Sequence, residues 1–89
     1  MKAFITVLGK DKPGIIAKIT GLLADHEVNV EDISQTIMQG NFTMIMLVSL
    51  EKADVTISSL SEAFDKLGKE IGVEIFVRSD KIYSAMHRV

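Results

Sequence analysis

The sequence of 89 residues contains no cysteine, no tryptophan and a single proline. The absence of cysteine excludes a disulfide framework and every site that needs thiolate ligands. Ten Lys and Arg against twelve Asp and Glu give a net charge of −2, so no net positive field attracts nucleic acid. No apolar run approaches the ~18 residues of a membrane span, and the short apolar N-terminal stretch lacks the features of a signal peptide. These absences predict a soluble, cytoplasmic protein with neither nucleic acid nor membrane as a partner.

The residues that are present have the composition of a globular domain. Hydrophobic residues make up 47% of the chain and charged residues 25%, which is close to the average for folded proteins. A chain of this length corresponds to one domain. We predict a single domain over residues 1–78, followed by a tail over residues 79–89.

The first third of the chain is typical of a strand followed by a helix. Residues 3–8 are continuously apolar and rich in β-branched side chains, as in a strand buried on both faces. From Ile15 onward, apolar residues recur at helical spacing. The turn between them predicts Asp11 or Lys12 as the helix cap and Pro13 in the first turn of the helix.

The middle of the chain is typical of a β-hairpin. A second strand is expected over residues 28–37, and its alternation breaks near Glu31, which predicts a bulge. Gly40 and Asn41 form a two-residue hairpin signal. Residues 42–50 then alternate with apolar side chains on both faces, which is typical of a central strand.

A second helix, a last strand and a tail complete the pattern. The helix is expected over residues 57–71, with Thr56 as its cap and Gly72 at its end. Residues 73–78 alternate as a strand with one polar face. The tail is predicted to form a short helix that needs something to pack on, because one side of it carries apolar residues, namely Ile82, Tyr83, Met86 and Val89.

This order predicts an α+β, ferredoxin-like βαββαβ sandwich: a four-stranded antiparallel sheet with two helices on one face, plus the short C-terminal helix. Two helices cover only one face, yet three of the strands carry apolar residues on both. We therefore expect the tail, a second copy of the chain, or both to cover the other face, and we predict a homodimer. Three methionines around the hairpin either contribute to that interface or fill the core: Met38, Met44 and Met46.

Several functions known for this architecture need chemistry that the sequence lacks. A metal carrier needs a cysteine pair, an RNA-binding sheet needs aromatic residues on its central strands, and an acylphosphatase needs an arginine in the first loop, whereas the only arginines are Arg78 and Arg88. No nucleophile motif is present.

His26 lies in an acidic stretch, but its place near the end of a predicted helix favours a structural role over a role as a metal ligand. His87 is expected at the surface. We predict no catalytic residue, no metal site and no cofactor.

The loop over residues 9–15 is the remaining candidate site. A helix that opens beside Gly14 directs unpaired N–H groups and the positive end of its dipole outward, which suits a carboxylate. Asp11 can accept from an ammonium group, and Asn29 can both donate and accept. Together these groups suit a zwitterion. The alternative remains that Asp11 only caps the helix, Gly14 only makes the turn and Asn29 only closes the next loop.

Two segments carry a family resemblance that extends over about residues 1–78. The segments DKPGI (residues 11–15), after a hydrophobic strand, and VNVEDI (residues 28–33), after an amphipathic helix, resemble those of the ACT domain. The tail is similar to that of small stand-alone ACT proteins. ACT domains are regulatory modules that bind amino acids or related metabolites, usually as dimers.

The resemblance implies where a ligand would bind. In the family the effector lies between the first loop of one subunit and the second strand, often of its neighbour. By position this implicates Asp11, Pro13, Gly14 and Ile15 in the loop, and Asn29 and Val30 on the strand.

We therefore expect a non-enzymatic, homodimeric regulatory domain that binds a small amino acid or related metabolite at the dimer interface. No catalytic or DNA-binding domain accompanies it, so it would act on a regulated protein in trans. The alternative is a structural dimerisation or protein-interaction module with no small-molecule ligand.

Overall fold

A computed structural model describes residues 1–81, and residues 82–89 lie outside this description. The chain folds in the predicted βαββαβ order, and the α+β ferredoxin-like prediction is confirmed. The elements are β1 (Lys2–Lys10), α1 (Ile15–Asp25), β2 (Asn29–Met38), β3 (Asn41–Ser49), α2 (Ile57–Ile71) and β4 (Val73–Ser79).

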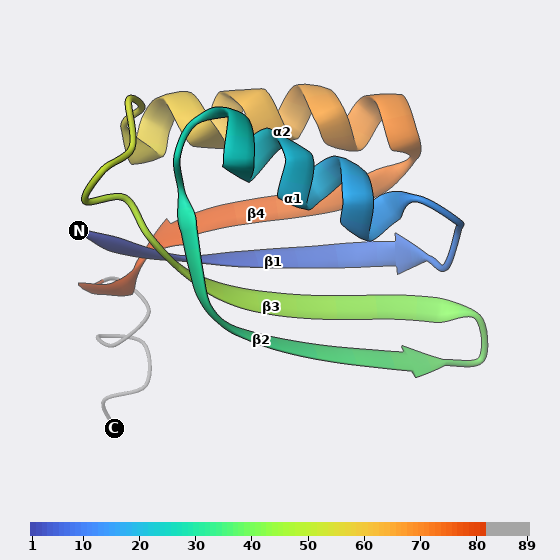
Figure 1. Cartoon of the computed structure of the whole chain (residues 1–89). Coiled ribbons are helices and arrows are strands. Elements are labelled where there is room, and N and C mark those ends of the chain that lie inside the picture. The colour runs from blue at the N-terminus through green and yellow to red at the C-terminus, as the bar shows by residue number, and fades with distance from the viewer. Residues whose placement is uncertain (82–89) are drawn as a thin grey trace.

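The four strands form one antiparallel sheet in the order β2-β3-β1-β4. Both helices lie on the same side of this sheet, and β2 is the strand farthest from them (Figure 1). The two edge strands, β2 and β4, therefore differ in how far the helices cover them. Contacts join α2 to β4, whereas every residue of β2 is exposed.

The core lies between the helices and three of the strands. Alternate side chains of β1, β3 and β4 point toward the helices and are buried, as the two-residue period of a strand requires. From the other side, Ile19 and Leu23 of α1 and Phe64 of α2 meet them. Met44 and Met46 have no exposed surface, so these two methionines fill the core and do not contribute to a dimer surface.

The predicted bulge in β2 is confirmed. Val30 pairs with Val48 and Asp32 with Leu47, so Glu31 has no partner of its own in the ladder. Its carboxylate lies 2.8 Å from the Lys2 ammonium of β1. The hydrogen bond and the charge of Glu31 raise the pKa of Lys2 above its ordinary value. The bulge therefore gives β2 a side-chain link across β3 to β1.

The start of α1 differs from the prediction. The cap residue is Gly14, in the left-handed conformation at φ 84°, and no side chain caps the helix. The expectation that Asp11 or Lys12 caps it is wrong, and Pro13 precedes the cap instead of lying in the first turn. The backbone reverses at Gly14 because a residue without Cβ adopts positive φ at little cost.

The ends of α2 are as predicted. The Thr56 hydroxyl accepts a hydrogen bond from the Ser59 N–H at 3.1 Å, and Gly72 ends the helix in the left-handed conformation.

The hairpin turn lies one residue earlier than predicted. Gln39 and Gly40 are the two turn residues, at φ 52° and 78°, as a tight type I′ turn requires. Asn41 is instead the first residue of β3 and pairs with Met38. Gly40 is thus the second residue of the turn, whereas the prediction made it the first.

After β4, Asp80 and Lys81 turn into a helical conformation. The predicted tail helix and its apolar side chains lie outside the described residues. Within residues 1–81, neither helix has the length and apolar character needed to cross a membrane.

Candidate functional site

A hollow of about 400 Å³ lies between the β1–α1 loop and the end of the β2–β3 hairpin. It gathers polar groups from the loop and from β2 against an apolar wall. Its lining consists of Asp11, Lys12, Gly14, Ile15, Ile16, Ala17, Gln35 and Phe42.

The loop that borders this hollow is held from two directions. The Asp11 N–H donates to the Gly40 carbonyl at 2.9 Å, which ties the loop to the hairpin turn. On the other side, the Lys12 ammonium lies 3.0 Å from the position that a Cβ on Gly72 would occupy. A cation at this position also suits the negative end of the α2 dipole. The loop is thus hydrogen-bonded to the hairpin turn, and its Lys12 side chain reaches the end of α2.

The start of α1 supplies hydrogen-bond donors to the hollow. The first helical bond of α1 runs from the Lys18 N–H to the Gly14 carbonyl at 3.0 Å. The preceding N–H groups, from Ile15 to Ala17, have no acceptor within the helix. Backbone N–H groups at a helix N-terminus favour a carboxylate or another anion.

Two side chains supply acceptors. Asp11 is exposed, and within residues 1–81 its carboxylate makes no ion pair. Gln35 extends from β2 and offers both a carbonyl and an amide group. A negative charge, a set of N–H donors and an amide thus border one hollow, and this combination is complementary to a zwitterion.

Only part of the predicted site comes together in one chain. Asp11, Gly14 and Ile15 line the hollow, and Pro13 lies in the same loop without lining it. Asn29 and Val30 stand at the opposite end of β2. Gln35 lies six positions after Asn29, which corresponds to about 20 Å along a strand.

Asn29 instead borders a second, more acidic hollow of about 370 Å³, lined also by Glu27, Glu31 and Glu51. One chain therefore does not bring Asn29 to the loop.

Gln35 is a polar residue that borders this hollow and was not predicted from the sequence. It pairs with the buried Met44, between Ile33 and Ile37, which pair with Met46 and Phe42. It is thus a polar residue within the row of β2 side chains that faces the helix side. The alternation of β2, once its bulge is taken into account, was a signal that could have identified Gln35.

His26 takes the structural role expected for it. It is the C-cap of α1, and its Nδ1 lies 3.1 Å from a carboxylate oxygen of Asp54. Throughout residues 1–81, no three His, Asp or Glu side chains group together as metal ligands would.

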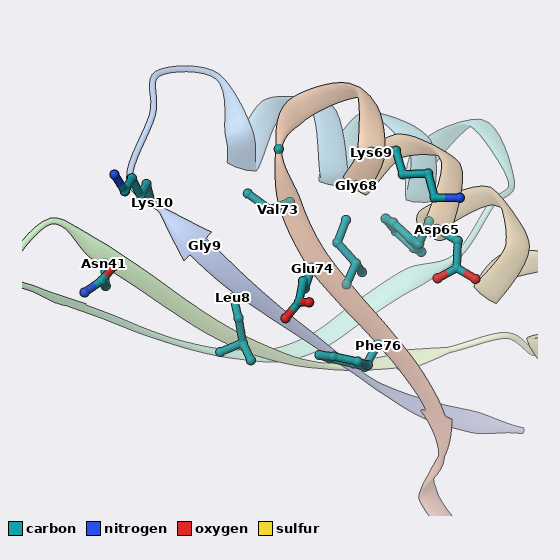
Figure 2. A pocket seen from close by; sticks show the side chains of 13 residues that line it. Leu8, Gly9, Lys10, Asn41, Asp65, Gly68, Lys69, Val73, Glu74 and Phe76 are labelled. Atoms are coloured by element: carbon teal, nitrogen blue, oxygen red, sulfur yellow. The ribbon is translucent and has the colours of Figure 1, made fainter.

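A larger hollow, of about 840 Å³, lies elsewhere, along the free edge of β4. Figure 2 shows β4 running through it, with Glu74 and Phe76 on one side and Asp65 and Lys69 of α2 on the other. It therefore follows an edge strand of the sheet. Because it does not contain the donors of a helix start, the smaller hollow at the loop is the better candidate site.

Comparisons with known proteins agree with this fold. The family model described as "ACT domain" matches residues 2–78. A UPF0237 protein of Methanopyrus kandleri is 49% identical over 88 residues, which are 99% of this chain and 98% of that protein. A UPF0237 protein of Clostridium acetobutylicum is 48% identical over 89 residues, which are 100% of both chains.

Two solved structures extend the comparison. An ACT domain protein from Streptococcus pneumoniae superposes with a TM-score of 0.82 at 40% identity, and the match covers 93% of each chain. The regulatory subunit of aspartate kinase from Thermus thermophilus superposes with a TM-score of 0.70 at 30% identity, covering 89% of this chain and 51% of that one.

Proposed function

Because this chain belongs to the ACT domain family, we propose that it is a non-enzymatic regulatory module that binds a free amino acid or a related metabolite in the hollow at the β1–α1 loop. The observation that carries this proposal is the convergence of three groups on one hollow: the N–H donors at the start of α1, the Asp11 carboxylate and the Gln35 amide. It would act in the cytoplasm, on a separate protein.

The chemistry of the hollow sets the orientation of the ligand. The ligand carboxylate accepts from the N–H groups that follow Gly14, where the helix dipole also favours negative charge. The ligand ammonium donates to Asp11, in a charge-assisted hydrogen bond. Gln35 is then free to contact either group or the ligand side chain.

A second copy of the chain would complete the site. β2 is an edge strand whose exposed apolar side chains include Ile33 and Ile37, at 46% and 52% exposure. A row of unpaired backbone groups with apolar side chains beside it is suited to pairing with another strand. We therefore propose a homodimer in which β2 pairs with β2 of the partner.

Antiparallel pairing places the start of one strand beside the end of the other. The partner subunit's Asn29 and the partner subunit's Val30 would then lie beside the end of β2 that borders the loop. The two halves of the predicted site, about 20 Å apart in one chain, would meet across the dimer axis.

The test is thermal unfolding of the full chain with each of the twenty amino acids at millimolar concentration. A ligand present at 100 times its dissociation constant stabilises the folded state by about 2.7 kcal/mol, and each kcal/mol raises the melting temperature of a domain of this size by roughly 4–8 °C. We expect one amino acid, or a few of similar chemistry, to raise the melting temperature by several degrees.

Two variants make the result specific to the site. Asp11→Asn removes the negative charge that pairs with the ammonium and should abolish the shift, whereas Asp65→Asn removes an exposed carboxylate from α2 and should leave it unchanged. A panel without any shift would contradict the proposal and favour the interaction module. A shift that survives in Asp11→Asn would place the ligand elsewhere.

A further inference from the structure

The face of the sheet turned away from the helices carries an apolar patch. We define the open-face patch by four side chains: Leu8, Ile45, Leu47 and Phe76. Leu8 and Phe76 are 37% and 39% exposed, and Ile45 and Leu47 are half-buried. They belong to the three adjacent strands β3, β1 and β4.

The patch has a definite outline. On the β2 side, the same face continues with Ser34 and Thr36, which pair with Ile45 and Thr43, so the apolar surface ends at β3. Along the strands it extends from Leu47, opposite Phe4, to Leu8. Leu8 lies four positions after Phe4 along β1, which corresponds to about 13 Å. Across the strands the patch reaches from β3 over β1 to β4, which is about 10 Å at the spacing of neighbouring strands. An α-helix with its side chains is about 10–12 Å wide, so the patch has the size of one short helix.

The chain itself turns onto this face. β4 ends at Ser79, which pairs with Ala3 at the end of the sheet nearest to Leu47. The last described turn, Asp80 and Lys81, lies below β1 on the side away from both helices (Figure 1). The Asp80 charge contributes to the raised pKa of Lys2, whose side chain belongs to the open face because its neighbour Ala3 points into the core.

The residues that follow carry complementary side chains. Residues 82–89 contain Ile82, Tyr83, Met86 and Val89, at the spacing of one side of a helix. Eight residues at the helical rise of 1.5 Å span about 12 Å, close to the length of the patch. We propose that residues 82–89 of the same chain dock on the open-face patch and cover Leu47, Ile45 and Phe76.

The open-face patch and the exposed edge at β2 would thus have different occupants. The exposed edge at β2 is left for a second copy, whereas the open face is covered from within the chain. If a second copy covered the open face, or if two copies exchanged residues 82–89, the contact would be lost on dilution. A contact within one chain would not depend on protein concentration.

The sequence provides its own probe for this contact. Tyr83 is the single tyrosine of the chain, and there is no tryptophan, so the near-ultraviolet fluorescence of the full chain reports on Tyr83. We would measure quenching of this fluorescence by acrylamide. The reference is a synthetic peptide of residues 80–89, in which the tyrosine is open to solvent. A docked segment is expected to give a quenching constant several-fold lower than that of the peptide, unchanged on dilution.

A pair of full-length variants locates the contact. Leu47→Glu introduces a charge at the patch and should raise the quenching constant toward the peptide value. Thr36→Glu introduces the same charge on the same face outside the patch, and should leave the constant unchanged. Far-ultraviolet circular dichroism verifies that each variant is folded. If Leu47→Glu fails to fold, Phe76→Gln on the edge strand β4 takes its place.

Three results would overturn the proposal. A wild-type quenching constant equal to that of the peptide would show that the segment is not docked. A low constant that neither patch variant raises would show that it docks elsewhere. A constant that rises on dilution would assign the contact to a second copy.

Discussion

Gly68 illustrates how a single missing side chain sets the packing of α2 against β4. A Cβ at this position would lie 2.6 Å from the Val73 carbonyl oxygen, a backbone atom that cannot move without shifting the strand. Gly21, in the middle of α1, has nothing within 4 Å of its Cβ position and is exposed. Close packing against β4 thus requires a glycine at Gly68, whereas no contact requires one at Gly21.

We therefore predict opposite effects for the same substitution. Gly68→Ala should lower the free energy of unfolding by about 1–3 kcal/mol through overpacking, whereas Gly21→Ala should raise it by about 0.4–1 kcal/mol by restricting the unfolded chain. Urea unfolding at a fixed protein concentration measures both. Equal effects of the two substitutions would contradict the close approach of α2 to Val73.

At the scale of the element, sequence periodicity predicted those helices and strands whose positions are set by the burial of apolar side chains. The apolar alternation of β3 and the helical spacing of α2 follow directly from which side chains leave water, so both elements lie where they were expected. The bulge near Glu31 was predictable for the same reason, since a break in alternation must be accommodated by the ladder. The start of α1 was not, because it depends on a glycine conformation at Gly14 that competes with side-chain capping at Asp11.

The two helices consequently start in different ways, and this difference is testable. Thr56 caps α2 through its hydroxyl, so Thr56→Ala should lower the free energy of unfolding by about 1 kcal/mol. Ser58→Ala, two residues further on at an exposed site, is the matched control and should change the free energy of unfolding by less than about 0.5 kcal/mol. The measurement is thermal or urea unfolding, and no loss in Thr56→Ala would mean that the hydroxyl has no capping role.

At the scale of the whole molecule, the candidate site was only half predictable. Loop residues such as Asp11 and Gly14 are adjacent in sequence and come together by chain connectivity. Gln35 reaches the same hollow only through the pairing of β2 with β3, which depends on the register and on the bulge. Asn29 and Val30 fall about 20 Å from Gln35 in one chain, and a single sequence does not state how two copies are arranged.

The proposed pairing of β2 between two copies of the chain is testable by a charge at the β2 edge. If β2 pairs with β2 of the partner, Ile37→Glu places two carboxylates in or beside the interface. Burial of an unpaired charge is costly, and like charges across an interface repel. We expect the dimer dissociation constant to rise on the order of 100-fold, equivalent to about 2.7 kcal/mol.

Sedimentation equilibrium of the full chain measures this constant, and Leu8→Glu is the matched control. Leu8 is also an exposed apolar residue, but it belongs to the open-face patch, so its substitution should leave the dimer intact. If instead Leu8→Glu dissociates the dimer and Ile37→Glu does not, the copies meet through the open face. The ligand site would then be confined to one chain, without the partner subunit's Asn29.

Because a ligand that binds across the β2 pair also stabilises the dimer, an amino acid that raises the melting temperature should strengthen the wild-type dimer. In the Ile37→Glu monomer, the same amino acid should bind more weakly.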